Sequence, residues 1–153
     1  MKLKKVYDEI IKASLNNDKA IIFLGKLEDK IAVSTDGFIM YFVPEKDFIF
    51  DIEKILRGGG RFNAKELTKD EPNAKPASRT GEMKEFLGKI AVKIGDKWVN
   101  EKYLKAFENP TFKTTDNYID PVYVYEDDEL VGLVMPIRGV VIKQEDCTVE
   151  EDD

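Results

Sequence analysis

The sequence of 153 residues contains no histidine and a single cysteine, Cys147. Without histidine, the chain has no Ser-His-Asp or Cys-His catalytic arrangement, no histidine metal ligand and no histidine general base. One cysteine does not make a disulfide framework. The glycine-rich segment 57–61 lacks the Lys-Ser/Thr pair of a nucleotide-binding P-loop. We therefore expect no enzymatic activity, no cofactor and no metal, and an enzyme that works through carboxylates is the weakest alternative.

Long apolar runs are also missing from the chain. No window approaches the roughly 18 apolar residues of a membrane-spanning helix. The N-terminal segment 1–15 mixes acidic with apolar residues, which predicts an amphipathic helix and not a signal peptide. With 42% hydrophobic and 35% charged residues, the composition predicts a soluble domain with a buried core. We expect a cytoplasmic protein without membrane association, in agreement with the single cysteine.

The net charge of −6 is concentrated at the C-terminus. Residues 145–153 hold six of the 30 acidic residues and none of the 24 basic ones, so residues 1–144 contain 24 of each sign. The overall acidity is therefore no argument against nucleic-acid binding by the body of the chain. The tail is expected to be a solvated end, with an interaction segment as the alternative.

The first third of the chain has the pattern of a helix followed by three strands. Apolar residues close to the i, i+3, i+4, i+7 spacing predict a helix over 3–16. Asp36-Gly37 predicts a hairpin between two of the strands, and Pro44 closes the unit. The expected strands cover residues 20–25, 30–35 and 38–43. A short strand passing into a helical turn is expected over 48–56.

A second unit with a similar pattern follows a long connection. Glycines, prolines and alternating charge over 57–82 predict a connection that is flexible in parts. Residues 85–99 predict one or two strands that turn at Gly95-Asp96. A helix over 100–107 is expected to begin with Asn100 as its N-cap and to bury Tyr103, Leu104 and Phe107. Three further strands are expected over 111–115, 122–126 and 130–137.

These elements predict an α+β fold with one domain over residues 1–144. Its two helix-plus-three-strand units, 1–56 and 83–144, are joined by the connection 57–82 and followed by the acidic tail 145–153. Such units can pack their sheets edge to edge with both helices on one face of the sheet, which places the core between the sheet and the two helices.

Three charged segments have both a functional and a structural interpretation. The acidic run 126–129 offers carboxylates to a divalent cation, although a solvated hairpin turn is favoured. The segment 57–61 offers backbone amides to a phosphate, although a helix stop followed by a loop is favoured. Lysines of the first helix, with Lys102 and Lys105 of the second, offer a phosphate-binding surface if both helices share a face. The (i, i+4) pair of Lys5 with Glu9 favours a solvated helix face instead.

Residues 97–138 resemble the final half-domain of the bacterial DNA polymerase III β subunit, the sliding clamp. The resemblance consists of an Asn-x-x-Tyr-Leu helix, a strand that opens after proline, and a last strand that closes in Met-Pro-x-Arg. The matching residues are Asn100, Tyr103, Leu104, Pro121, Val122, Leu133, Val134, Met135, Pro136 and Arg138. The Thr35-Asp36-Gly37 hairpin is similar to one in the same family. A clamp domain consists of two helix-plus-three-strand units, and a clamp subunit has three domains, whereas this chain has the length of one.

The resemblance implies a non-catalytic, clamp-like binding protein of phage or mobile-element type. In that family, the end of the last strand helps to form an apolar cleft in which protein partners dock short linear peptides, so the cleft residues here are Met135, Pro136, Ile137 and Arg138. The helices of the family face DNA, which gives Lys12, Lys102 and Lys105 as DNA-facing candidates. Assembly into a ring of six copies and action as a monomeric adaptor are both open.

An alternative interpretation belongs to a different class of function. The chain would then be a protein-mimicking inhibitor or adaptor of a nucleic-acid enzyme, acting through its acidic tail or through the 57–82 segment.

Overall fold

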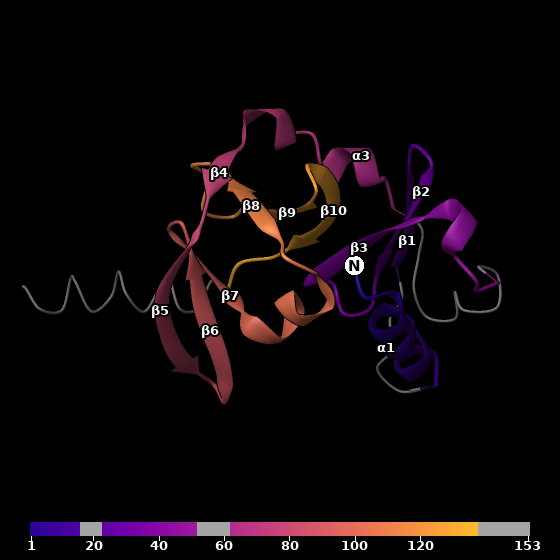
Figure 1. Cartoon of the computed structure of the whole chain (residues 1–153), viewed down its shortest axis with the longest axis horizontal. Coiled ribbons are helices and arrows are strands. Elements are labelled where there is room, and N and C mark those ends of the chain that lie inside the picture. Colours follow the sequence, from indigo (N-terminus) through magenta and orange to yellow (C-terminus); the bar gives the residue numbers. More distant parts are fainter. Residues whose placement is uncertain (16–22, 52–61, 138–153) are drawn as a thin grey trace, which may run out of the picture.

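Ten strands in two antiparallel sheets make up most of the regular secondary structure in the computed structural model, which describes residues 1–15, 23–51 and 62–137 (Figure 1). The larger sheet has the order β1-β2-β3-β10-β9-β8-β4 and the smaller sheet the order β5-β6-β7. The larger sheet contains β1 (Phe23–Leu27), β2 (Lys30–Ser34), β3 (Ile39–Pro44), β4 (Lys75–Ala77), β8 (Thr111–Thr114), β9 (Val122–Glu126) and β10 (Glu129–Val134). The smaller sheet contains β5 (Arg79–Phe86), β6 (Lys89–Ile94) and β7 (Lys97–Asn100). The α+β class expected from the sequence is confirmed.

The helical segments of the described residues are short except for the first. They are α1 (Leu3–Leu15), α3 (Ala64–Leu67) and the 3-10 turns η1 (Glu45–Asp47), η2 (Glu71–Asn73) and η3 (Glu101–Ala106). The helix expected over 100–107 is therefore a 3-10 helix, although Asn100 caps it as expected, with its side chain accepting a hydrogen bond from Lys102 N at 3.1 Å.

The first three and the last three strands lie edge to edge because β3 pairs with β10. In this antiparallel ladder Ile39 lies opposite Val134, and Tyr41 lies opposite Gly132. α1 with β1 to β3, and η3 with β8 to β10, correspond to the helix and three strands predicted for each unit, whereas the strands predicted over 85–99 lie in the smaller sheet. Strand β4 extends the larger sheet beyond β8.

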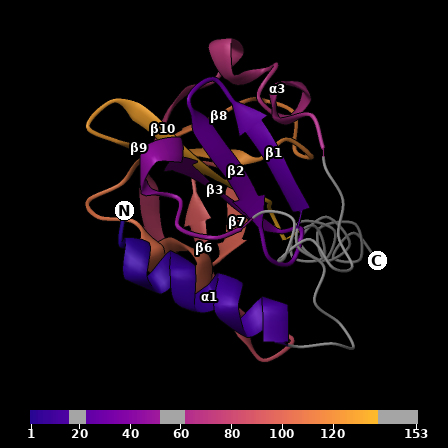
Figure 2. The ribbon, with the colours of Figure 1, turned by 90° about the vertical axis from the view of Figure 1, so that its right-hand side faces the viewer.

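Both faces of the larger sheet are buried, as successive side chains of the central strands show. Along β3, Tyr41 belongs to the cluster under α1 and η3, whereas Phe42 belongs to the cluster under α3. The same alternation holds for Val124 and Tyr123 on β9. Figure 2 shows α1 and α3 on opposite sides of this sheet. The helical cover that α3 gives to the second face was not predicted.

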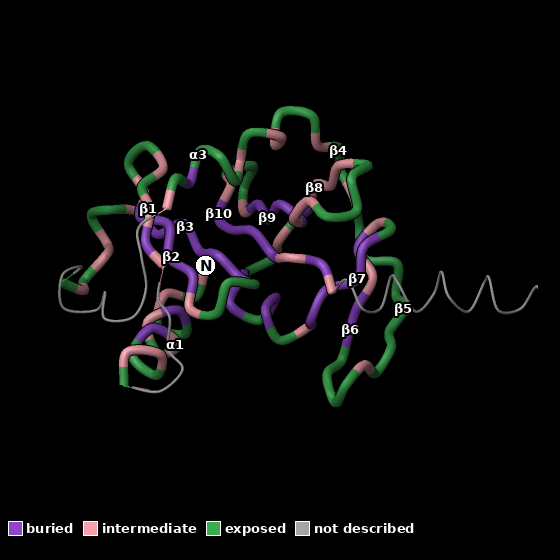
Figure 3. Tube along the Cα trace, turned by 180° about the vertical axis from the view of Figure 1, so that it is seen from behind, coloured by how far each residue is buried: buried purple, intermediate pink, exposed green. Residues whose placement is uncertain are grey.

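The connection predicted over 57–82 contains helices and strands, which the sequence did not indicate, in the part that the structure describes. Residues 62–82 contain α3, η2, β4 and the first half of β5. Strand β4 has three residues, and residues 79–85 of β5 are all exposed (Figure 3). Such segments have no apolar periodicity, because their pairing depends on backbone hydrogen bonds and not on burial. Residues 57–61 lie outside the described residues.

The strand expected at the start of 48–56 is also wrong. Residues 48–51 form no strand, because Phe48 and Phe50 pack against the core cluster beneath α1 instead of joining a sheet. The Tyr7 hydroxyl of α1 donates a hydrogen bond to the Asp47 carbonyl just before this segment. Residues 52–56 lie outside the described residues.

Gly132 of β10 leaves no room for a side chain, because Phe107, at the end of η3, packs against it. A Cβ atom there would lie 2.6 Å from Phe107 Cζ and 2.8 Å from the Met40 carbonyl oxygen. We expect Gly132→Ala to lower the free energy of unfolding by about 1–3 kcal/mol, since overpacking forces neighbouring groups out of place. Urea-induced unfolding measures this change.

The Phe107→Leu background provides the control for this prediction. The shorter side chain removes part of the clash, so Gly132→Ala should cost about 1 kcal/mol less there than in the wild type. An equal cost in both backgrounds would show that the ring of Phe107 does not set the constraint.

Candidate functional site

The segment that follows β10 bridges the two sheets. Met135 N donates to the Phe38 carbonyl at 2.8 Å, at the start of β3, and Ile137 N donates to the Trp98 carbonyl of β7 at 2.7 Å. Pro136 lies between these two donors, at a position where no amide donor is used. The proline therefore ends the strand without loss of a ladder hydrogen bond, and the segment is fixed on both sides of it.

A groove of about 480 Å³ runs along this segment. Its walls come from four places far apart in the sequence: the β2–β3 turn, the β5–β6 turn, the start of η3 and residues 135–137. The lining residues are Gly37, Phe38, Phe86, Leu87, Lys89, Asn100, Tyr103, Met135, Pro136 and Ile137. Phe38 is 58% exposed and Leu87 is 79% exposed. Large apolar side chains at the mouth of a groove are a feature of binding sites.

The structure brings together three of the four predicted cleft residues. Met135, Pro136 and Ile137 line the groove, and Arg138 lies outside the described residues. The sequence reasoning missed Phe38, Phe86 and Leu87. Phe86 ends β5, and Leu87 belongs to the β5–β6 turn, where Leu87 and Gly88 both have positive φ. The sequence Leu-Gly is not one of the strong hairpin signals.

Hydrogen bonds to carboxylates fix Tyr103, which lines the groove, and the nearby Tyr41. The Tyr103 hydroxyl donates to Asp36 Oδ2 at 2.5 Å, and the Tyr41 hydroxyl donates to Glu9 Oε2 at 2.7 Å. Burial raises the pKa of both tyrosines, and the neighbouring carboxylates raise it further. Burial also raises the pKa of Glu9, against the opposing effects of the Tyr41 hydrogen bond and of the Lys5 charge. The first bond links η3 to the β2–β3 turn, and the second links β3 to α1.

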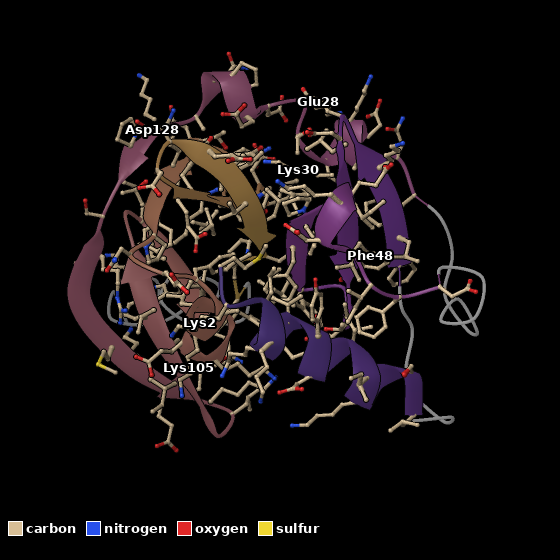
Figure 4. The ribbon with its side chains drawn as sticks, turned by 45° about the vertical axis from the view of Figure 1, so that its right-hand side comes forward. Lys2, Glu28, Lys30, Phe48, Lys105 and Asp128 are labelled. Atoms are coloured by element: carbon tan, nitrogen blue, oxygen red, sulfur yellow. The ribbon has the colours of Figure 1, made fainter. Side chains whose placement is uncertain are left out.

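A second groove, of about 650 Å³, is lined by several cationic side chains and is called the cationic groove. It lies where the start of α1 meets η3, and Lys2 N donates to the Ala106 carbonyl there at 2.7 Å. Lys2, Lys5, Arg79 and Lys105 line it with one carboxylate, Glu101. Figure 4 shows Lys2 and Lys105 close together at this junction.

The three predicted DNA-facing lysines do not all line the cationic groove. Lys12, Lys102 and Lys105 are all exposed, on two helices that cover the same face of the larger sheet. Only Lys105 lines the cationic groove. The Lys102 ammonium lies 5.1 Å from the centre of the Tyr103 ring. The sequence did not single out Arg79, because β5 was not predicted.

The acidic run 126–129 is a hairpin turn, as the favoured interpretation predicts. Asp127 and Asp128 have φ values of 52° and 64°, which a tight turn between β9 and β10 requires. Glu126 accepts from Glu108 N at 2.6 Å, and Glu129 pairs with Lys30. In the described residues, no group of three or more aspartate, glutamate or cysteine side chains is arranged to hold a metal ion. None of the helices described is long and apolar enough to cross a membrane.

Comparison of the chain with protein-family models, with curated proteins and with solved structures gives no significant match. The resemblance to the sliding clamp therefore depends on the residues named above.

The raised pKa of Glu9 predicts a pH dependence of stability. In the folded protein Glu9 keeps its proton to a higher pH than in the unfolded chain, so stability falls as the pH rises through this interval and stays lower above it. We expect Glu9→Gln, which can still accept from Tyr41, to raise the unfolding midpoint at pH 7 and to have little effect at pH 4. Urea-induced unfolding at the two pH values measures the difference.

The matched control is Asp8→Asn, which removes an exposed carboxylate paired with Lys4 on the same helix. It should show no stabilisation at pH 7. A Glu9→Gln variant less stable than wild type at pH 7 would mean that the charged carboxylate contributes more than its burial costs.

Proposed function

We propose that this chain is a non-catalytic, sliding-clamp-like binding protein whose groove along residues 135–137 captures an extended apolar peptide segment of a protein partner. The observation that carries the proposal is the position of Met135, Pro136 and Ile137 in a groove whose mouth exposes Phe38 and Leu87. In the clamp family that the chain resembles, the residues that match these three help to form the wall of the peptide cleft.

The groove suits a peptide because its backbone is already fixed. The hydrogen bonds of Met135 and Ile137 hold one wall, and the bond from Tyr103 to Asp36 holds the floor against the β2–β3 turn. A preorganised wall does not have to be ordered when the partner binds. Apolar anchors of the peptide would then supply most of the binding energy by burying Phe38 and Leu87.

The test uses peptides selected from a random library on the immobilised wild-type protein. Leu87→Glu places a charge at the mouth of the groove on an exposed side chain, and Met135→Glu places one in its wall. We expect each substitution to weaken the selected peptides by about tenfold or more, because a central apolar anchor is worth roughly 2 kcal/mol. Isothermal titration calorimetry measures the affinities.

Ile49→Glu is the matched control, since Ile49 is another exposed apolar side chain and is not among the residues that line the groove. It should leave the affinities unchanged. Selected peptides that bind Leu87→Glu and Met135→Glu as tightly as wild type would contradict the proposal that the groove binds the peptide.

We also propose that the cationic groove between α1 and η3 contacts nucleic-acid phosphates. Four cationic side chains and one carboxylate line it, and Arg79 forms an ion pair with that carboxylate at 3.4 Å. Lys2, Lys5 and Lys105 remain for phosphate. The groove lies on the face that the clamp resemblance assigns to DNA.

Lys105→Gln tests this contact through the salt dependence of DNA binding. Loss of one phosphate contact should reduce the slope of log K against log salt concentration by about one. Fluorescence anisotropy with labelled duplex DNA at several salt concentrations gives the slope. Lys46→Gln, on η1 and not among the lining residues of the cationic groove, should leave it unchanged. An unaltered slope for Lys105→Gln would place DNA elsewhere or exclude it as a partner.

The alternative function, an inhibitor or adaptor of a nucleic-acid enzyme, retains only part of its basis. Most of residues 62–82 lie in short helices and strands, whereas that alternative partly relied on 57–82 as a long loop. The acidic tail lies outside the described residues. Binding of a partner protein by a single clamp-like domain remains the function that the geometry supports best. Assembly into a ring is a separate proposal.

A further inference from the structure

A third cavity, of about 450 Å³, lies on the α3 face of the larger sheet, next to the groove along residues 135–137. We call it the compartment. Gly37, Phe38 and Met135 line both spaces, so these residues form a ridge between them. Apolar side chains of β3, β10 and the loop before β9 line the compartment, among them Met40, Leu133 and Ile119. Polar side chains from α3 and from the same loop lie along its edge.

The wall of the compartment contains a buried polar group that lacks a hydrogen-bond partner. Tyr123 of β9 is 0% exposed, and within the described residues its hydroxyl has no hydrogen-bond partner. Buried hydroxyl groups in native structures almost always have a partner, and an unsatisfied one is costly. Since Tyr123 lines the compartment, a bound ligand can supply the missing partner.

The charges around this hydroxyl favour a cation. Burial first, then the carboxylates of Asp120, Asp70 and Glu71, raise the pKa of Tyr123 to about 12, so the phenol stays neutral. Glu66, Asp70 and Asp120 line the compartment with a single cation, Lys69, which gives three negative charges, one positive and a net charge of −2. Lys69 already pairs with Glu66 at 3.7 Å. Asp120 accepts a hydrogen bond from the Thr115 hydroxyl at 2.6 Å, and the Lys97 ammonium donates to the Asp120 carbonyl at 2.9 Å, so part of its charge is already balanced. No ion pair of the described residues involves Asp70.

We propose that this compartment binds an aliphatic ammonium group, the end of a lysine side chain in the partner peptide. The apolar walls would take the methylene stem, the Tyr123 hydroxyl would accept a hydrogen bond from the ammonium group, and Asp70 and Asp120 would balance its charge. The identification with a peptide side chain depends on the proposed function of the neighbouring groove. The preference for a cation is a property of the compartment itself.

Binding requires a small opening of the edge, because the hydroxyl is covered in the structure. Leu67 and Ile119, which line the compartment, are 44% and 41% exposed. Neither belongs to a core cluster of the described residues, so we expect their side chains to move aside without exposing the core. The signals of these two residues are therefore expected to change when the ligand binds.

Three probes of equal length test the preference on the whole protein. Isotope-labelled protein is titrated at pH 7 with n-pentylamine, 1-pentanol and pentanoate, and chemical shifts are followed by NMR. We expect n-pentylamine to shift the signals of Leu67, Ile119 and Leu133 and to bind about tenfold more tightly than 1-pentanol, with pentanoate the weakest. Equal binding of amine and alcohol, or tightest binding of pentanoate, would overturn the proposal.

Single substitutions separate the hydroxyl from the charge. Tyr123→Phe removes only the hydroxyl and should weaken n-pentylamine severalfold, while Asp70→Asn should remove most of the preference for the amine over the alcohol. Asp116→Asn is the matched control, because Asp116 is an exposed carboxylate of the same loop that does not line the compartment. An amine preference that persists in both Tyr123→Phe and Asp70→Asn would place the cation elsewhere.

These outcomes are independent of the peptide test. Peptides that bind the groove and lose affinity with Leu87→Glu, with no amine preference in the compartment, would support the proposed function and overturn this inference. A clear amine preference in a protein that selects no peptide would support the cation site and contradict the proposed function.

Discussion

The antiparallel pairing of β3 with β10 is the interaction on which the rest of the structure depends. It joins two sets of strands through residues that are more than half of the chain apart, with Met40 opposite Leu133 and Tyr41 opposite Gly132. Gly132 lets the ring of Phe107 lie against the ladder, so η3 packs on the same face as α1. The bond from Met135 to Phe38 continues this ladder and becomes the wall of the groove.

The parts of the fold that could be predicted from the sequence are those with strong burial or strong local geometry. Strands β3 and β9 are buried on both faces and therefore appear as continuous apolar runs, and Asp36-Gly37 and Asn100 have local signals that need no tertiary context. Strands β4 and β5 gave no such signal. They are short or exposed, and they exist because β8 and β6 offer them backbone partners.

The candidate site was predictable on one side only. Proline at the end of an apolar strand, together with the clamp-like motif, indicated the 135–137 wall. The opposite wall depends on how the β5–β6 turn returns toward Phe38, which is a long-range property. Tyr123 looks like an ordinary strand residue in the sequence, since the lack of a hydrogen-bond partner for its hydroxyl follows only from the packing around it. Sequence patterns predict burial far better than they predict whether a single buried polar atom has a hydrogen-bond partner.

The ridge formed by Gly37, Phe38 and Met135 makes the groove and the compartment two halves of one surface. A peptide that crosses this ridge would place apolar residues on one side and a basic residue on the other, with Phe38 between them. The backbone under the ridge is held by the bonds of Met135 and Ile137, so a ligand on one side does not have to reorder the other side. The two halves should therefore contribute nearly additively to affinity, except at Phe38 and Met135, whose side chains line both.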